Sequence, residues 1–209
     1  METLVETPEQ ATSAALLLDR DAPMPAPPRV TVRYADYRAL DLDDNFFYEL
    51  LQGELVKKAV PSPLHQRIVR KILLVLENFR TAQNLGGEVF TSPIDVFLDD
   101  ENAPQPDVLF IREENKQIIT QDGIVGAPDI AVEVVSPSSV IRDRITKMRV
   151  YAQFGVQEYW VIDVNNVTLE IYRNTAGTFE LDNYAVETGT AESRVLQGLT
   201  LDIATLFAS

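Results

Sequence analysis

Two short apolar runs near the middle of the chain each contain one carboxylate, and they restrict the folds open to this sequence. Residues 106–111 include Asp107, and residues 130–136 include Glu133. β-Branched and large apolar residues bounded by Pro, Gly or Ser predict short buried strands. An ionised carboxylate there is costly unless it is paired or binds a metal. With the basic segment 142–149 that follows, the runs predict a metal site with a positively charged neighbour.

Length and composition indicate one globular, soluble domain. The 209 residues are 45% hydrophobic and 24% charged, which suits an ordinary core. No apolar run approaches the roughly 20 residues that span a bilayer, and the N-terminus has no signal-peptide pattern. The chain has no cysteine and a single histidine, His65, so thiol chemistry and a multi-histidine metal site within one chain are excluded. We therefore expect a cytoplasmic protein without a membrane partner.

The charge distribution bears on DNA as a partner. A net charge of −14 argues against nucleic-acid binding. However, residues 57–80 contain six basic residues and one acidic residue, and residues 142–149 contain four and one. These segments are either two solvated helix faces or patches that attract a polyanion, and the second interpretation requires them to converge in space.

The chain divides into a tail and one folded domain. Residues 1–30 end in a proline-rich run and predict a flexible tail, in which a short helix could form at 8–18. The folded domain then covers residues 31–209. At its start, residues 47–56 predict a hairpin that turns at Gln52 and Gly53. Glu49 on this hairpin is either a solvated strand-end carboxylate or an auxiliary metal ligand.

A helix is predicted to follow the hairpin. Ser62 is suited to the N-cap and Pro63 to the first helical position. Apolar residues at helical spacing define its buried face: Ile68, Ile72, Val75, Leu76 and Phe79. His65 lies on that face in the first turn, where it is either a buried imidazole bonded to a neighbour or one that points into an active-site cleft.

The later elements predict an α/β fold with a mixed central sheet flanked by helices. A helix at 139–154 connects two strands of the sheet and places Asp143, Lys147 and Tyr151 on one face. In the strand before it, Glu133 and Val135 point to the face opposite Val134. The other predicted strands are residues 88–91, 94–98, 156–163 and 169–173.

These residues resemble the PD-(D/E)XK nuclease superfamily, with a restriction-endonuclease-like core, and more narrowly the Uma-two family. The resemblance extends over about residues 30–205. It rests on Pro106-Asp107 and Glu133 with Asp143 and Lys147, and on the segments 48–50, 61–65, 128–137 and 155–160.

The resemblance implies a metal-dependent endonuclease that hydrolyses DNA with Mg²⁺ or Mn²⁺. Asp107, Glu133 and the carbonyl of Val134 would bind the metal, and Lys147 would assist an activated water. The superfamily lysine expected two residues after the glutamate is Val135 here, and Lys147 on the next helix is its match. Auxiliary roles fall to Asp143, which would orient Lys147, and to Glu49 and His65. By analogy with restriction-like folds, a homodimer is expected.

Three alternatives remain. The site could be structural, with Asp107 capping a turn and Glu133 forming a buried ion pair with Lys147. The chain could then be a catalytically silent nuclease-fold scaffold or binding module, which its acidity and Val135 favour. It could also be a metallohydrolase that acts on another phosphate ester.

Overall fold

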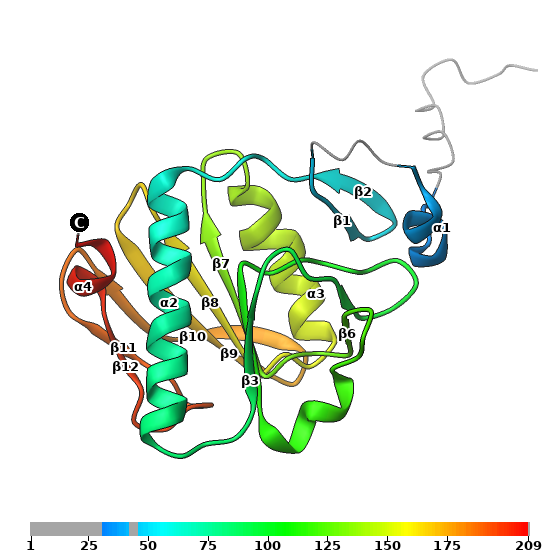
Figure 1. Cartoon of the computed structure of the whole chain (residues 1–209). Coiled ribbons are helices and arrows are strands. Elements are labelled where there is room, and N and C mark those ends of the chain that lie inside the picture. Colours follow the sequence, from blue (N-terminus) through cyan, green and yellow to red (C-terminus); the bar gives the residue numbers. More distant parts are fainter. Residues whose placement is uncertain (1–30, 42–45, 209) are drawn as a thin grey trace, which may run out of the picture.

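The computed structural model describes residues 31–41 and 46–208 (Figure 1). The predicted tail, residues 1–30, and the helix considered at 8–18 lie outside the described residues. The extent of the folded domain therefore remains a proposal.

A six-stranded sheet forms the centre of the fold, with strand order β10-β9-β8-β7-β5-β3. β7 and β8 are parallel, and the other neighbours in this sheet are antiparallel, so the predicted mixed sheet is confirmed. The strands are β3 (Glu88–Thr91), β5 (Val108–Ile111), β7 (Ile130–Val135), β8 (Glu158–Asp163), β9 (Thr168–Thr175) and β10 (Thr178–Val186).

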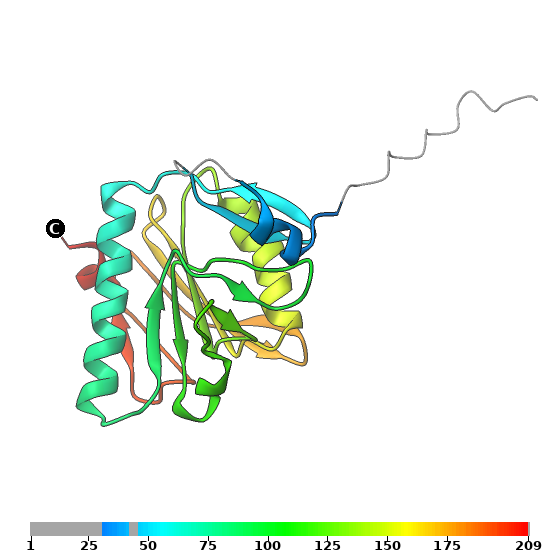
Figure 2. The ribbon, with the colours of Figure 1, turned by 45° about the vertical axis from the view of Figure 1, so that its right-hand side comes forward.

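The parallel pair requires a crossover, and a helix provides it as predicted. This helix consists of a π-helical segment, η2 (Arg142–Lys147), followed by α3 (Met148–Gln153). It covers one face of the sheet, and α2 (Pro63–Ala82) covers the other (Figure 2). Ile68, Ile72 and Leu76 of α2 are fully buried.

The alternation along β7 assigns its side chains to the two layers. Ile130, Val132 and Val134 pack in the core beneath α2, whereas Ala131 and Val135 pack with Tyr151 of α3. This agrees with the alternation predicted from the sequence. Glu133 therefore belongs to the layer that contains Lys147, where its carboxylate meets that ammonium group.

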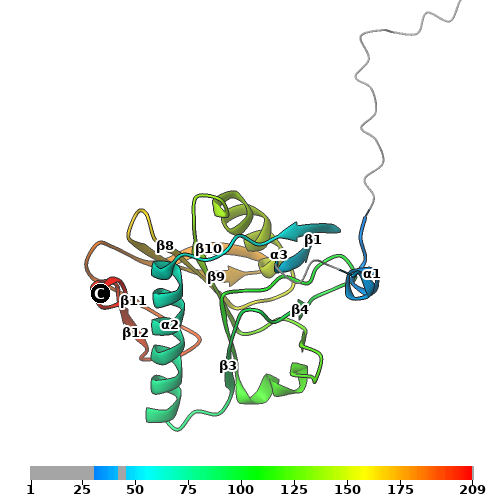
Figure 3. The same cartoon turned by 45° about the horizontal axis from the view of Figure 1, so that its top comes forward.

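The predicted hairpin is formed by β1 (Tyr48–Leu51) and β2 (Glu54–Lys57). Its turn residues Gln52 and Gly53 both have positive φ, 51° and 73°, which fits a two-residue hairpin turn. β1 is bridged to the segment before β5 through Leu50 and Ala103. The hairpin thus lies near the crossover helix (Figure 3), so that Glu49 reaches Lys147.

The remaining elements are short. They are α1 (Tyr34–Ala39), β4 (Val96–Phe97), η1 (Glu113–Ile118), β6 (Ile124–Val125), β11 (Thr190–Glu192), β12 (Thr200–Asp202) and α4 (Ile203–Phe207). The predicted strand at 94–98 is reduced to β4, which pairs with β6. None of the helices in the described ranges has the length and apolar character needed to cross a membrane.

The strand predicted at 106–111 begins at Val108, so Pro106 and Asp107 precede it. The physical reason is that proline has no N–H to donate to a neighbouring strand. The register pairs Val108 with Val132, and the Asp107 N–H donates to the Val132 carbonyl at 3.0 Å. Backbone pairing with β7 therefore reaches Asp107, and the Asp107 side chain bonds the next strand position that faces it, Val134.

Candidate active site

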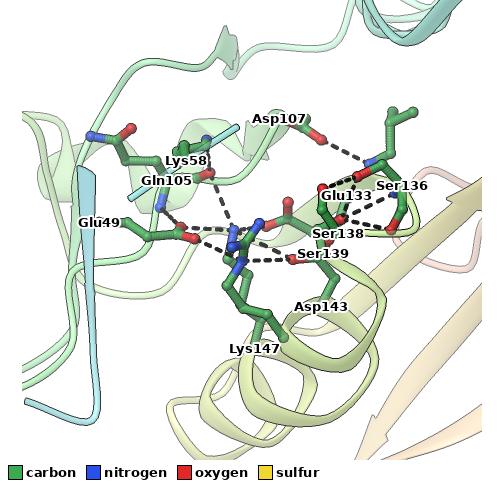
Figure 4. A network of polar contacts seen from close by, with 12 residues as sticks. Glu49, Lys58, Gln105, Asp107, Glu133, Ser136, Ser138, Ser139, Asp143 and Lys147 are labelled. Carbon is green, nitrogen blue, oxygen red and sulfur yellow. Dashed lines mark hydrogen bonds and ion pairs between the residues drawn. The ribbon is translucent and has the colours of Figure 1, made fainter. Parts of the chain in front are cut away.

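A pocket of about 480 Å³ opens where β5 begins, beside the C-terminal end of β7. Six of the residues singled out from the sequence line it: His65, Asp107, Glu133, Val134, Asp143 and Lys147. They come from α2, the segment before β5, β7 and η2, which the topology brings together from distant parts of the chain. Figure 4 labels four of these residues, Asp107, Glu133, Asp143 and Lys147, together with Glu49.

Asp107 is fixed just before the start of β5. Its Oδ2 accepts the backbone N–H of Val134 at 2.8 Å, in place of a strand partner. The carboxylate therefore bonds across strands and does not cap a turn, which contradicts that part of the structural alternative. N–H and C=O of one residue face the same side of such a strand, so the Val134 carbonyl also faces the segment before β5.

His65 meets the same carboxylate. Its Nε2 lies 3.1 Å from Asp107 Oδ2, while its Nδ1 is buried without a hydrogen-bond partner among the described residues. The imidazole is bonded to a neighbour and also lines the pocket, and its role in an active site stays a proposal. Ser62 Oγ accepts the backbone N–H of His65 and so caps α2 as predicted.

Lys147 is fully buried between two carboxylates. Its Nζ lies 2.8 Å from Glu133 Oε1 and 2.8 Å from Glu49 Oε2, and it also donates to the Gln105 carbonyl at 3.5 Å. Glu133 Oε1 also accepts the Tyr151 hydroxyl at 3.3 Å. The ion pair between Glu133 and Lys147, which the structural alternative predicts, is thus present. Glu49 is 0% exposed, so the interpretation as a solvated strand-end carboxylate is wrong.

Asp143 contributes less to Lys147 than the i, i+4 spacing predicts. Its Oδ1 is 3.9 Å from Lys147 Nζ, longer than either glutamate contact. The reason is that η2 is π-helical, so i→i+5 hydrogen bonds widen the turn and move residues four apart out of direct alignment. Asp143 Oδ1 makes no hydrogen bond within the described chain.

Burial and neighbouring charges shift the ionisation of these groups in different directions. Burial raises the pKa of Glu133 well above its usual value; Lys147 opposes this, and the carboxylates of Asp143, Asp107 and Glu49 add to it. Burial alone would lower the pKa of Lys147, but the carboxylates of Glu133 and Glu49 raise it overall. Lys147 is therefore an ammonium ion and cannot act as a general base at neutral pH.

Asp107 remains ionised for a different reason. Burial would raise its pKa, but the hydrogen bond and charge of His65, with the charges of Lys58 and Lys147, lower it overall. An ionised carboxylate is the form that can bind a cation or accept hydrogen bonds.

Three residues of the site were not assigned a role from the sequence. Lys58 and Arg142 line the pocket. Gln105 connects three charged side chains through its backbone: its N–H donates to Glu49, and its carbonyl accepts from Lys58 and Lys147. The basic segments had indicated Lys58 and Arg142 only as charges. Gln105 acts mainly through its backbone, which leaves no signal in residue type.

The two basic segments converge only in part. Lys58 from the first and Arg142 and Lys147 from the second line the same pocket. Yet Arg142 Nε lies 3.2 Å from Glu49 Oε1, and Arg144 bonds both oxygens of Glu170. Most of the positive charge of segment 142–149 is therefore balanced within the protein.

The available donors suit a hard divalent cation. Asp107 Oδ1 and Glu133 Oε2 make no hydrogen bond within the described chain, and the Val134 carbonyl faces the segment before β5. No three His, Asp or Glu side chains among the described residues form a metal-binding cluster. Mg²⁺ does not require one, because it commonly binds one or two carboxylates and retains several waters. The residues present therefore fit Mg²⁺ or Mn²⁺.

Comparisons with known proteins agree with this arrangement. The family model Uma2, described as "Putative restriction endonuclease", matches residues 34–204. Among solved structures, the chain is similar to the crystal structure of a putative nuclease belonging to DUF820 from Anabaena variabilis ATCC 29413, determined at 1.96 Å resolution. The two share 18% sequence identity with a TM-score of 0.69, over 84% of this chain and 97% of the other. No curated protein matches the chain. The predicted restriction-endonuclease-like fold class is confirmed.

Proposed function

This chain belongs to the Uma2 family, and we propose that it is a metal-dependent endonuclease that hydrolyses DNA phosphodiester bonds. One observation carries the proposal: Asp107 and Glu133, from separate parts of the chain, line one pocket together with Lys147. The family description and the nuclease-like fold support the same reaction class.

Each protein group has a specific task in this proposal. Asp107 and Glu133 would hold Mg²⁺ or Mn²⁺, with the Val134 carbonyl as a further oxygen donor. The bound cation would neutralise phosphate charge and lower the pKa of a water molecule. His65 and the Val134 N–H fix Oδ2 of Asp107, which leaves Oδ1 for the cation.

Lys147 acts through Glu133. Its ammonium group lies 2.8 Å from Glu133 Oε1 and holds that carboxylate in one orientation, while Glu49 holds Lys147 from the other side. Fixed charges in a buried site stabilise charge that develops during reaction without reorganisation. In this role Lys147 positions Glu133 and contributes a constant positive field.

Cleavage of plasmid and linear DNA in Mg²⁺ or Mn²⁺ tests the proposal. Asp107→Asn and Glu133→Gln preserve side-chain shape but remove the charge, so we expect each to lower the cleavage rate by at least about a hundredfold. Asp122→Asn, at an aspartate whose side chain is 83% exposed, is the control and should cleave like the wild type. Equal cleavage by all four proteins would contradict the assignment.

A catalytically silent binding module is the second candidate. Its first support is that all three N–H donors of Lys147 already have acceptors, in Glu133, Glu49 and Gln105. Its second support is that Val135 occupies the usual lysine position. Calorimetric titration with Mg²⁺ or Mn²⁺ discriminates the two. No binding, or binding that is unchanged in Glu133→Gln, favours the silent module.

The assembly and location are also proposals. Two copies would let two sites address two DNA strands, by analogy with restriction-like folds. Light scattering of the purified protein at several concentrations would test this, and a monomer at all of them would exclude a stable dimer. A cytoplasmic location follows from the absence of cysteine and remains to be tested by fractionation.

A further inference from the structure

Four side chains that are or can become cationic line the pocket: Lys58, His65, Arg142 and Lys147. They differ in how far the protein already balances their charge. Lys147 is fully buried and lies 2.8 Å from each of two glutamates. Arg142 Nε lies 3.2 Å from Glu49 Oε1 and 3.5 Å from Asp143 Oδ1. His65 is hydrogen-bonded to Asp107.

Lys58 has a different environment. Its Nζ donates to Ser92 Oγ at 3.1 Å and to the Gln105 carbonyl at 2.9 Å, and both acceptors are neutral. Within the described part of the chain, Lys58 forms no ion pair with a carboxylate. An ammonium group has three N–H donors, so one remains after these two bonds.

The two acceptors fix Lys58 beside Asp107. The Ser92 N–H donates to the Asp107 carbonyl at 3.2 Å, and Gln105 is two residues before Asp107. Gln105 also accepts from Lys147, so the two lysines lie on either side of one carbonyl group. Lys58 is therefore a positioned charge and not a mobile surface lysine.

We propose that Lys58 contacts a non-bridging phosphate oxygen of the nucleic-acid substrate, an inference that rests on the proposed function. A phosphate entering this pocket meets the carboxylates of Asp107 and Glu133 and needs a cation to approach them. A lysine ammonium without a carboxylate partner is suited to bind a phosphate oxygen as a point charge. Lys147 cannot do so without leaving its glutamates, whereas Lys58 has a free donor.

DNA binding without metal tests this role. A fluorescein-labelled 20-base-pair duplex is titrated by anisotropy in EDTA at several NaCl concentrations. We expect Lys58→Gln to weaken binding roughly fivefold to tenfold and to reduce the slope of log K against log [NaCl] by about one. Lys57→Gln is the matched control, because Lys57 is the preceding residue, is exposed and lies over the Phe46 ring. It should change affinity less than twofold.

Acetylation of the wild-type protein gives an answer even if Lys58→Gln does not fold. We expect saturating duplex to protect Lys58 from an amine-reactive acetyl ester, while Lys57 is modified equally with and without DNA. Unchanged labelling of Lys58, equal affinities of the two variants, or no binding of duplex by the wild type at low salt would each overturn the inference.

The outcome is separable from that of the proposed function. A protein that binds duplex through Lys58 but cleaves nothing in Mg²⁺ or Mn²⁺ would retain this inference and lose the endonuclease proposal. A protein that cleaves DNA with binding independent of Lys58 would lose only this inference.

Discussion

At the scale of single residues, Lys147 determines how the site is organised. The superfamily pattern that the sequence resembles has a lysine two residues after the glutamate, where this chain has Val135, and Lys147 lies on the following helix. Spacing alone predicted that Lys147 shares a helix face with Asp143 and Tyr151. Its second partner could not be predicted in this way, because Glu49 is almost a hundred residues away in sequence and lies in a separate hairpin.

Replacing Lys147 should destabilise the fold. Lys147→Met leaves Glu49 and Glu133 buried without their cation, and breaking a buried pair in this way typically costs about 3–5 kcal/mol. We expect the loss in urea unfolding at pH 7 and a partial recovery at acidic pH, where the carboxylates become protonated. Lys116→Met is the control, because Lys116 pairs with Glu88 and Glu113 near the surface and should shift the midpoint little. Equal midpoints for the two variants would contradict the buried-pair interpretation.

The acidic residues of the site could be identified from the sequence more readily than the basic ones. Asp107 and Glu133 were identifiable because a carboxylate on an apolar strand is unusual. Lys58 and Arg142 were not, because lysine and arginine are common on solvated helix and strand ends. Only the three-dimensional contacts separate Lys58, with neutral acceptors, from Arg142, with carboxylates nearby.

At the scale of elements, hydrophobic periodicity predicted the two helices that cover the central sheet and five of its six strands. Two features escaped it. The π-helical segment η2 depends on backbone hydrogen bonding that residue types do not reveal. The late start of β5 at Val108 leaves Asp107 just before the strand, where its side chain accepts the Val134 N–H.

The first turn of α2 links an element to the site. Ser62 caps this helix, and His65 in the same turn bonds Asp107. We expect Ser62→Ala to lower the free energy of unfolding by about 1 kcal/mol, the usual loss for a removed N-cap. Ser62→Asp should retain the stability, since aspartate is an equally good cap. Urea unfolding of both variants measures this, and equal losses in the two would show that the cap is not the stabilising contact.

At the scale of the whole molecule, one buried region contains acidic groups whose pKa values are shifted in opposite directions. Burial alone would raise the pKa values of Glu49 and Asp107. Nearby cations and hydrogen bonds outweigh burial, so both pKa values are lowered overall. The pKa of Glu133 and Asp143 is raised, chiefly by burial, against the effect of Lys147. Their contributions to stability therefore change with pH in opposite directions.

This arrangement predicts a stability maximum at mildly acidic pH. Glu49 and Asp107 stabilise the fold above their unfolded pKa values of 4.5 and 3.8, and this contribution is lost as pH falls through their lower folded values. Glu133 and Asp143 contribute below their unfolded values of 4.5 and 3.8, and that contribution is lost as pH rises through their higher folded values.

Urea unfolding from pH 3 to pH 8, in buffers without divalent cations, measures the loss of stability on both the acidic and the neutral side of this maximum. We expect the free energy of unfolding to fall below about pH 4 and to decline again toward neutral pH. Glu133→Gln cannot ionise at this position, so it should reduce the decline toward neutral pH and leave the loss on the acidic side in place. A wild type whose stability rises steadily from pH 5 to pH 8 would show that Lys147 fully compensates the buried carboxylates, and that Glu133 is ionised without a metal.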